Sequence, residues 1–313
     1  GEMPLCCDFI SLQSSHNDMV MKDFTAGQLS ADDSNLLLEA LQKQISEPPV
    51  TFHAGGGYHN LMVAKSQSVV DMHTGRLTPP NELIGEGIRR HMPDKSKELV
   101  HIITQAQIIL HNHIYNKDKR KTGKDLVNSI WLWGNGKAPV LPSFASRFQK
   151  SASMITASNL FKGMGLSAGI NVAPVQGATG FVNTNYQGKV ETALRELESQ
   201  DAVFLQVSAS EFASLHGNID DKIMAIEDFD DKILGPILSA LTSQKNVKIL
   251  LAVNHVSSVV HMKYTKDAVP FVVYPARLGA DSVKQFDENI LKGGSGHFGD
   301  GPALVEALFK GEL

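Results

Sequence analysis

The side chains best suited to metal chemistry lie in the second half of the chain, just after apolar runs. Glu211 and His216 follow the run FLQV, and His255 and then His261 follow KILLAV. Such runs are typical of buried strands in a parallel sheet, where ligands gather at the carboxyl ends of the strands. Carboxylates and imidazoles are ordinary ligands of zinc or manganese. These residues are therefore either a small metal site or polar loop residues at the edge of a sheet.

Two glycine-rich segments resemble phosphate-binding loops without matching their context. In GNGKAP, residues 134–139, backbone amides and Lys137 are suited to holding an anion. The full phosphate loop, however, needs a longer spacing between its glycines and a Ser or Thr after the lysine. GSGHFG, residues 294–299, fits the dinucleotide-binding pattern, but a predicted helix precedes it instead of a strand. We expect a surface or small-anion loop at the first segment and a turn at the second.

Composition excludes several classes of protein. The chain has 313 residues, of which 42% are hydrophobic and 20% charged, as in ordinary globular proteins. A net charge of -4 gives no attraction to nucleic acid, and no apolar run is long enough to insert into a membrane. Cys6 and Cys7 are adjacent, so a disulfide between them would be strained. A reducing compartment, cytoplasmic or an organelle matrix, is the expectation.

Residues 1–126 have the pattern of a small α+β domain. PLCCDFISL and MVMKDF predict two strands around the turn SSHND. Ser30 is placed to cap a helix that ends before Pro48. A second strand pair is expected on either side of the glycines at 55–57. The clearest helix has its apolar residues at a 3.6-residue period; these are Leu99, Ile102, Ile103, Ala106, Ile109 and Leu110.

Residues 127–313 instead alternate strands with helices. Strands are predicted at 130–133, 171–175, 202–207, 247–253 and 269–274. Amphipathic helices are predicted at 158–168 and 187–199, and a long one runs through Ile223 to Ile237. This alternation indicates an α/β fold with a mostly parallel sheet flanked by helices.

Several long motifs resemble one family. IWLWGNGKAPVLPSF, ITASNLFKGMGLSAGI and GATGFVNTNYQGKVETAL are similar to the archaeal-type 2,3-bisphosphoglycerate-independent phosphoglycerate mutases. DFTAGQLSADDSNLLLEAL and FHAGGGYHNLMV resemble the inserted domain of that family. The resemblance implies an alkaline-phosphatase-like core preceded by a smaller inserted α+β domain. It also implies transfer of phosphate between the 3- and 2-hydroxyls of glycerate, through a serine beside two divalent metals (Mn, Mg, Zn or Co).

Most metal-ligand positions of the family carry other residues here. Where the family has Asp-Glu-x-x-His, with Asp and His as ligands, this chain has Glu211 and Leu215. The family's Asp-His pair is Asn254-His255, and a later ligand histidine falls on Tyr264. Leucine cannot coordinate a metal and asparagine is a weak neutral ligand. Glu211 and His255 are thus vestigial ligands, and we expect no bound metal cofactor, although one metal on these two with His216 and His261 stays open.

The substrate-binding positions implied by the resemblance are also altered. The family's Tyr-Arg-His is Tyr58-His59-Asn60 here, so an arginine suited to gripping substrate is replaced by His59. A weak anion site is still expected. Its residues are Lys137, His113, Asn116, Arg120 and His59.

Three functions are compatible with this pattern. The first is a phosphoglycerate-mutase-like pseudoenzyme with no catalytic residues and a structural or interaction role. The second is a genuine mutase of glycolysis, seen without the opening segment that carries the family's nucleophilic serine. The third is a sensor of phosphoglycerate-type ligands. A sheet lacking that opening segment would expose an edge, so a protein partner or a second copy of the chain is expected. A small phosphorylated ligand is the other expected partner.

Overall fold

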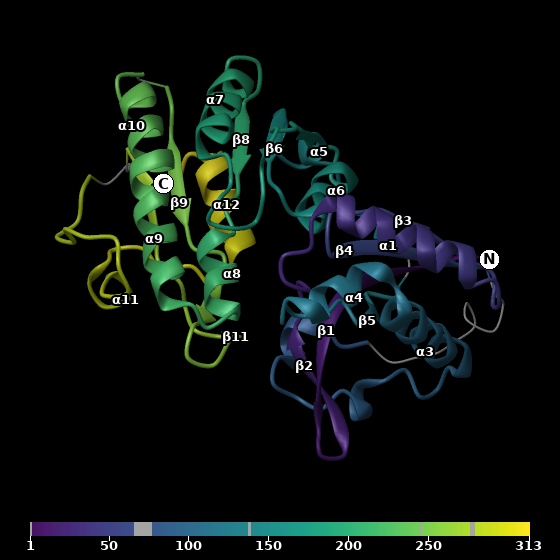
Figure 1. Ribbon diagram of the computed structural model, residues 1–313. Coiled ribbons are helices and arrows are strands. Elements are labelled where there is room, and N and C mark those ends of the chain that lie inside the picture. Colours follow the sequence, from purple (N-terminus) through teal and green to yellow (C-terminus); the bar gives the residue numbers. More distant parts are fainter. Residues whose placement is uncertain (1, 66–76, 137–138, 245, 276–278) are drawn as a thin grey trace. The chain divides into compact units, whose positions relative to one another are not determined.

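The chain folds as two compact units. The computed structural model describes residues 2–65, 77–136, 139–244, 246–275 and 279–313. Contacts divide the chain into Gly1–Ala138 and Pro139–Leu313 (Figure 1). The boundary falls after residue 138, whereas the sequence pattern predicts it after residue 126. The difference arises because β5 (Ser129–Trp133) pairs with β1 (Met3–Ser15) of the first unit. The strand that holds both tryptophans therefore belongs to the first sheet and is not the first strand of the parallel one.

The first unit is an antiparallel sheet with helices packed on one face. Besides β1 and β5, its strands are β2 (Asp18–Asp23), β3 (Val50–His53) and β4 (His59–Ala64). Its helices are α1 (Ala31–Gln44), α3 (Lys97–Asn112) and α4 (Ile114–Lys121), with short 3-10 turns η1 (Pro80–Leu83) and η2 (Arg89–His91). The strand order is β2-β1-β4-β3. β5 lies off this path and also pairs with β1.

Strand β1 organises this sheet because three strands pair with it. Its first half lies between β4 and β5, and a register shift at Ser11/Leu12 precedes its pairing with β2. The predicted hairpin around SSHND is confirmed, with Ser15 opposite Asp18. Successive side chains of a strand point to opposite faces. Cys7 and Phe9 therefore face the helices, and Cys6 and Asp8 face the other way.

The helices form where the apolar periodicity predicts them. Ser30 caps α1 by accepting a hydrogen bond from the Asp33 amide, and Ser96 caps α3 in the same way. The six periodic apolar residues of α3 are all buried. They pack with residues of α1 and with the inner face of the sheet in one hydrophobic core.

The second unit contains more but shorter elements. Its helices are α5 (Phe144–Phe148), α6 (Asn159–Ser167), α7 (Tyr186–Leu197), α8 (Ala209–Leu215), α9 (Ile219–Phe229), the π-helical turn η3 (Asp230–Leu234), α10 (Gly235–Leu241), α11 (Ile290–Gly293) and α12 (Gly301–Lys310). Its strands are β6 (Ala152–Ile155), β7 (Asn171–Val172), β8 (Ala202–Leu205), β9 (Ile249–Ala252), β10 (Val256–Ser258), β11 (Lys263–Thr265) and β12 (Phe271–Tyr274). None of the helices in the described ranges is long and apolar enough to cross a bilayer.

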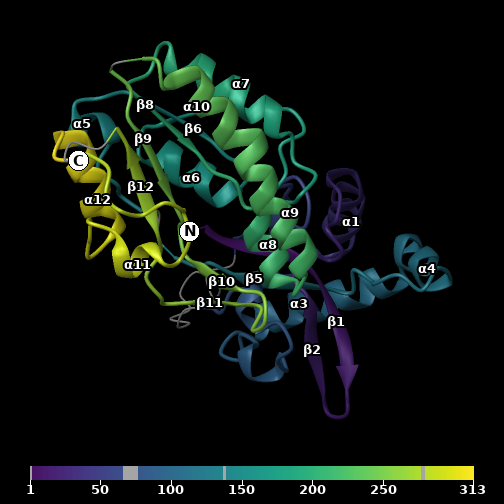
Figure 2. The same ribbon diagram turned by 90° about the vertical axis from the view of Figure 1, so that its left-hand side faces the viewer.

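A parallel sheet in the order β7-β6-β8 lies between helical layers, as Figure 2 shows for β6 and β8. Met154 and Phe204 pack toward α5 and α12, whereas Ile155 and Leu205 pack on the opposite face. Strand β6 was not predicted from the sequence. The α/β class with a parallel sheet flanked by helices is confirmed.

The two later strands differ from the prediction. β9 pairs antiparallel with β12 instead of joining the parallel sheet among the described strands. The chain between them forms the β10–β11 hairpin and contains no helix. A parallel crossover needs a connection of a dozen or more residues, usually a helix, so this segment favours antiparallel pairing.

We expect Ile102→Ala to lower the free energy of unfolding of the first unit by about 2–5 kcal/mol, because it leaves a cavity in a packed core. Ile102 is fully buried, whereas Ile108 on the same helix is 53% exposed. The control Ile108→Ala should change the value by less than about 0.5 kcal/mol. Both tryptophans lie in β5, so tryptophan fluorescence during urea unfolding reports on this unit. Equal effects of the two substitutions would contradict the described core.

Candidate functional site

The predicted vestigial ligands come together in the second unit. Glu211 lies in the first turn of α8, just after β8, and His255 lies between β9 and β10. Tyr264 is in β11, directly opposite Ser257 of β10. The β10–β11 hairpin thus brings Tyr264 next to His255, which precedes the hairpin in the chain. Three segments far apart in sequence build this cluster, which we call the Glu211 cluster (Glu211, Asn254, His255 and Tyr264).

Hydrogen bonds and ring packing hold the cluster together. The Tyr264 hydroxyl donates to Glu211 Oε1 at 2.6 Å. His255 Nε2 lies 3.6 Å from the same carboxylate oxygen. The rings of His255 and Tyr264 meet edge to face, with centroids 4.4 Å apart and an interplanar angle of 88°. Glu211 is therefore held by a phenol where the resemblance implies a metal.

Asn254 contacts the other ring nitrogen of His255. Asn254 Nδ2 lies 3.0 Å from His255 Nδ1. The His255 Nε2 atom is buried and has no hydrogen-bond partner among the described residues. The imidazole therefore presents Nε2 toward the Glu211 carboxylate.

The other residues of the predicted metal site make other contacts. Leu215, at the end of α8, is 2% exposed and packs as a core residue. His216 caps α8, and its Nδ1 lies 2.7 Å from the carbonyl oxygen of Phe212. His261 is exposed, and its backbone amide donates to Ser258 Oγ. In the described part of the chain, no group of three or more His, Cys, Asp or Glu side chains is arranged to hold a metal.

The predicted anion-site residues are used mostly for structure. Lys137 lies outside the described residues. Asn116 is fully buried and binds three backbone groups: its Nδ2 donates to the carbonyls of Leu110 and Val127, and its Oδ1 accepts from the Val127 amide. Asn116 therefore fixes the chain after α4 and has no group left for an anion. The described contacts of Asn116 are therefore structural.

His113 and Arg120 belong to the same helical corner. The His113 side chain caps α4 by accepting from the Tyr115 amide, and burial lowers its pKa. A lowered pKa keeps this histidine neutral at physiological pH, which does not favour anion binding. Arg120 Nη2 donates to the carbonyl of His111 at 2.8 Å.

His59 lies beside a buried carboxylate. Its Nδ1 is 2.5 Å from Oδ1 of Asp8, which is only 2% exposed. Burial alone would lower the pKa of His59, but the charge and hydrogen bond of Asp8 raise it to about 10. The other oxygen, Asp8 Oδ2, accepts from Trp133 Nε1 at 2.8 Å. His59 is thus a cation at neutral pH whose charge is paired within the protein.

Lys189, on α7, is a second unusual charge. It is fully buried, and burial lowers its pKa to about 8. Its Nζ donates to the carbonyl of Thr179 at 3.5 Å, a long bond for a buried ammonium. Buried lysines are costly and concentrate at functional sites. Thr179 belongs to the GATG motif, so the buried ammonium of Lys189 lies against the backbone of this motif.

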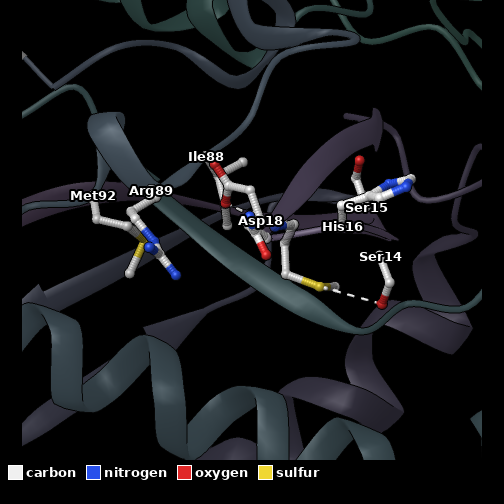
Figure 3. Close-up of a pocket in the computed structure, with 9 residues that line it drawn as sticks. Ser14, Ser15, His16, Asp18, Ile88, Arg89 and Met92 are labelled. Carbon is white, nitrogen blue, oxygen red and sulfur yellow. Dashed lines mark hydrogen bonds between the residues drawn. The ribbon is translucent and has the colours of Figure 1, made fainter.

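A surface hollow of about 560 Å³ lies at the tip of the first unit's hairpin. Figure 3 shows side chains of the β1–β2 turn on one side and Ile88, Arg89 and Met92 on the other. Its lining is Ser14, Ser15, His16, Asn17, Asp18, Met19, Ile88, Arg89 and Met92. This hollow could not be predicted from the sequence, because the segments that line it are distant in the chain.

Comparisons with known proteins show which family the chain resembles. A sequence model described as the Metalloenzyme superfamily matches residues 19–305. A probable 2,3-bisphosphoglycerate-independent phosphoglycerate mutase of Geobacter sulfurreducens is 33% identical over 304 residues, which cover 96% of this chain and 75% of that protein. A 2,3-bisphosphoglycerate-independent phosphoglycerate mutase of Methanosarcina mazei is 35% identical over 295 residues, 93% of this chain and 74% of that protein. The PH0037 protein of Pyrococcus horikoshii has a similar fold, with a TM-score of 0.64, 21% identity, and coverage of 94% of this chain and 69% of that one.

The chain therefore belongs to the metalloenzyme superfamily. Within it, the chain belongs to the family of 2,3-bisphosphoglycerate-independent phosphoglycerate mutases. The resemblance of its long motifs to this family is confirmed.

The residues of the Glu211 cluster do not fit the two divalent metals that this family implies. Two metals about 3.5–4 Å apart need several anionic or imidazole ligands. The described cluster offers one carboxylate, Glu211, which accepts from Tyr264, and one imidazole, His255. Leu215 and Asn254 supply no anionic donor. No reaction step through a metal pair can be derived from these residues.

The ion pair of His59 and Asp8 predicts a pH dependence of stability. The pKa of His59 is about 10 in the folded chain against an ordinary 6.5. Its contribution is complete below pH 6.5 and is lost as the pH rises toward 10. We expect the free energy of unfolding of wild type minus that of His59→Gln to fall across this window, measured by urea unfolding with tryptophan fluorescence. His53→Gln, on the neighbouring strand, is the control, and a difference independent of pH would contradict the pairing.

Proposed function

We propose that this chain is a phosphoglycerate-mutase family member that has lost catalysis at this site and has a structural or interaction role. The observation that carries the proposal is the hydrogen bond from Tyr264 to Glu211 Oε1, at 2.6 Å. A carboxylate that binds a metal must direct its lone pairs at the ion. In this chain a phenol hydrogen takes one of them, from a position where the resemblance implies a histidine ligand.

The neighbouring substitutions support the same proposal. Leu215 replaces a ligand with a buried apolar side chain, which packs into the end of α8. Asn254 replaces an anionic ligand with a neutral amide that bonds to His255. Each replacement is satisfied by a contact inside the protein. An apolar contact and a polar cluster thus stand where the resemblance implies ligands that converge on an ion.

The expected interaction partner is a protein or a second copy of the chain. β7 and β8 are the outer strands of the sheet among the described residues. Outer strands carry backbone groups that can pair with another chain. This supports a partner without identifying it.

Direct measurements distinguish this proposal from two other functions, a genuine mutase and a ligand sensor. The relatives named above are phosphoglycerate mutases, so turnover of 3-phosphoglycerate would favour a genuine enzyme. Binding of 3-phosphoglycerate without turnover, measured by calorimetry, would favour a ligand sensor. The proposal expects neither result at millimolar ligand.

Calorimetric titration with Mn²⁺ tests the proposal at the level of the ligands. We expect little binding by wild type, because Glu211 and His255 alone make an incomplete site. Combining Leu215→His, Asn254→Asp and Tyr264→His should tighten binding at least about tenfold, since three donors are added around the two that remain.

The matched control adds His255→Ala to the triple variant, which should remove the gain. Tight Mn²⁺ binding by wild type that Glu211→Ala abolishes would overturn the proposal. Circular dichroism of each variant establishes that the second unit is still folded.

A further inference from the structure

A thiol, an imidazole and a carboxylate lie together on the face of the first sheet that points away from its helices. Cys6 and Asp8 are two residues apart on β1, so their side chains share a face. His59 on β4 is directly opposite Asp8, and Trp133 on β5 is directly opposite Cys6. Diagonal neighbours on adjacent strands are within reach of long and aromatic side chains. His59 can therefore contact both Asp8 and Cys6.

The carboxylate of this group is fixed on both sides. Asp8 is 2% exposed, with one oxygen 2.5 Å from His59 Nδ1 and the other 2.8 Å from Trp133 Nε1. The ring of Trp133 also lies against that of His59, with centroids 5.8 Å apart. The imidazole is thus oriented by a buried, immobile partner.

The thiol lies within reach of the same imidazole and of solvent. Cys6 interacts with His59 and, after Asp8, contributes to the raised pKa of that histidine. The Nδ1 atom of His59 is engaged by Asp8. Cys6 is free and half-buried, whereas Cys7 is free and 1% exposed on the helical side of the sheet. Small reagents can therefore reach Cys6 but not Cys7.

Gly134 leaves room for the sulfur. It follows β5 with φ +70°, a conformation that favours glycine. A Cβ at this position would lie 3.0 Å from Cys6 Sγ, closer than real contacts allow without movement. The glycine therefore keeps the space over the thiol open.

This arrangement has the parts of an activated thiol. A thiolate is the nucleophilic form of cysteine, and a neighbouring cation stabilises it. His59 is that cation, and Asp8 keeps it charged at neutral pH. Among the described titratable side chains, His59 and Cys7 interact with Cys6.

We propose that Cys6, His59 and Asp8 form a nucleophilic thiol site that reacts with the disulfides of small thiols. The Cys6 thiolate attacks one sulfur of the disulfide, a new S–S bond forms, and the old S–S bond breaks. The departing sulfur leaves as a thiolate and takes a proton from water. The incoming disulfide is the oxidant, and the product is a mixed disulfide on Cys6.

The mixed disulfide should persist. Cys7 is the second of only two cysteines in the chain, and its side chain points to the opposite face. Burial raises the pKa of the Cys7 thiol well above its usual range, which keeps it protonated. No second thiol of this chain is placed to displace the adduct, so the site records exposure to an oxidised thiol.

The test is the rate of reaction with 2,2′-dithiodipyridine, an uncharged disulfide that His59 does not attract by charge. At pH 7 we expect one adduct per chain, on Cys6, formed about tenfold faster than in His59→Gln. His53→Gln, on the exposed edge of β3, should react at the wild-type rate. Cys7→Ser should still be labelled once and Cys6→Ser not at all, as determined by intact mass and peptide mapping.

Labelling of His59→Gln at the wild-type rate, or of Cys7 in place of Cys6, would overturn the proposal. If His59→Gln loses its folded tryptophan fluorescence, the wild type supplies the second measurement. Its rate at pH 6.5 should exceed that of the urea-unfolded chain, whose cysteines react as ordinary thiols. An equal or slower rate in the folded chain would contradict the site.

Discussion

A carboxylate in each unit of this protein accepts hydrogen bonds from donors on other segments, and for the buried Asp8 these donors offset its removal from water. In the first unit, the buried Asp8 is bound by His59 and Trp133. In the second unit, Glu211 is bound by Tyr264 and faces His255. In each case the donor comes from a different segment of the chain. The polar contacts therefore join strands and helices as well as defining the chemistry.

The two clusters have opposite consequences for function. The donors around Glu211 occupy a carboxylate at a position where the resemblance implies a metal ligand. The donors around Asp8 hold His59 as a cation beside Cys6, which adds a chemical property to the first unit. Membership of a family of metal-dependent mutases thus coexists with a site whose residues do not fit two metals.

The sequence predicted elements whose signal is local. The apolar stripe of α3, the cap Ser30 and the hairpin after β1 are all encoded within a few residues. β5 was assigned to the wrong sheet because IWLW is apolar throughout, and its pairing with β1 depends on contacts distant in sequence. The Glu211 cluster was expected from family motifs, but its hydrogen bonds were not. The site at Cys6 was missed because it depends on the register of β1 with β4, although the alternation of Cys6 and Asp8 on one strand face could have indicated it.

We propose that the residues around Glu211 do not support mutase chemistry. Phosphorus NMR of 3-phosphoglycerate incubated with the purified chain and Mn²⁺ or Mg²⁺ tests this proposal. We expect no 2-phosphoglycerate and no released phosphate above a protein-free control. Turnover that disappears in both Glu211→Ala and His255→Ala would contradict it, because those residues would then be working metal ligands.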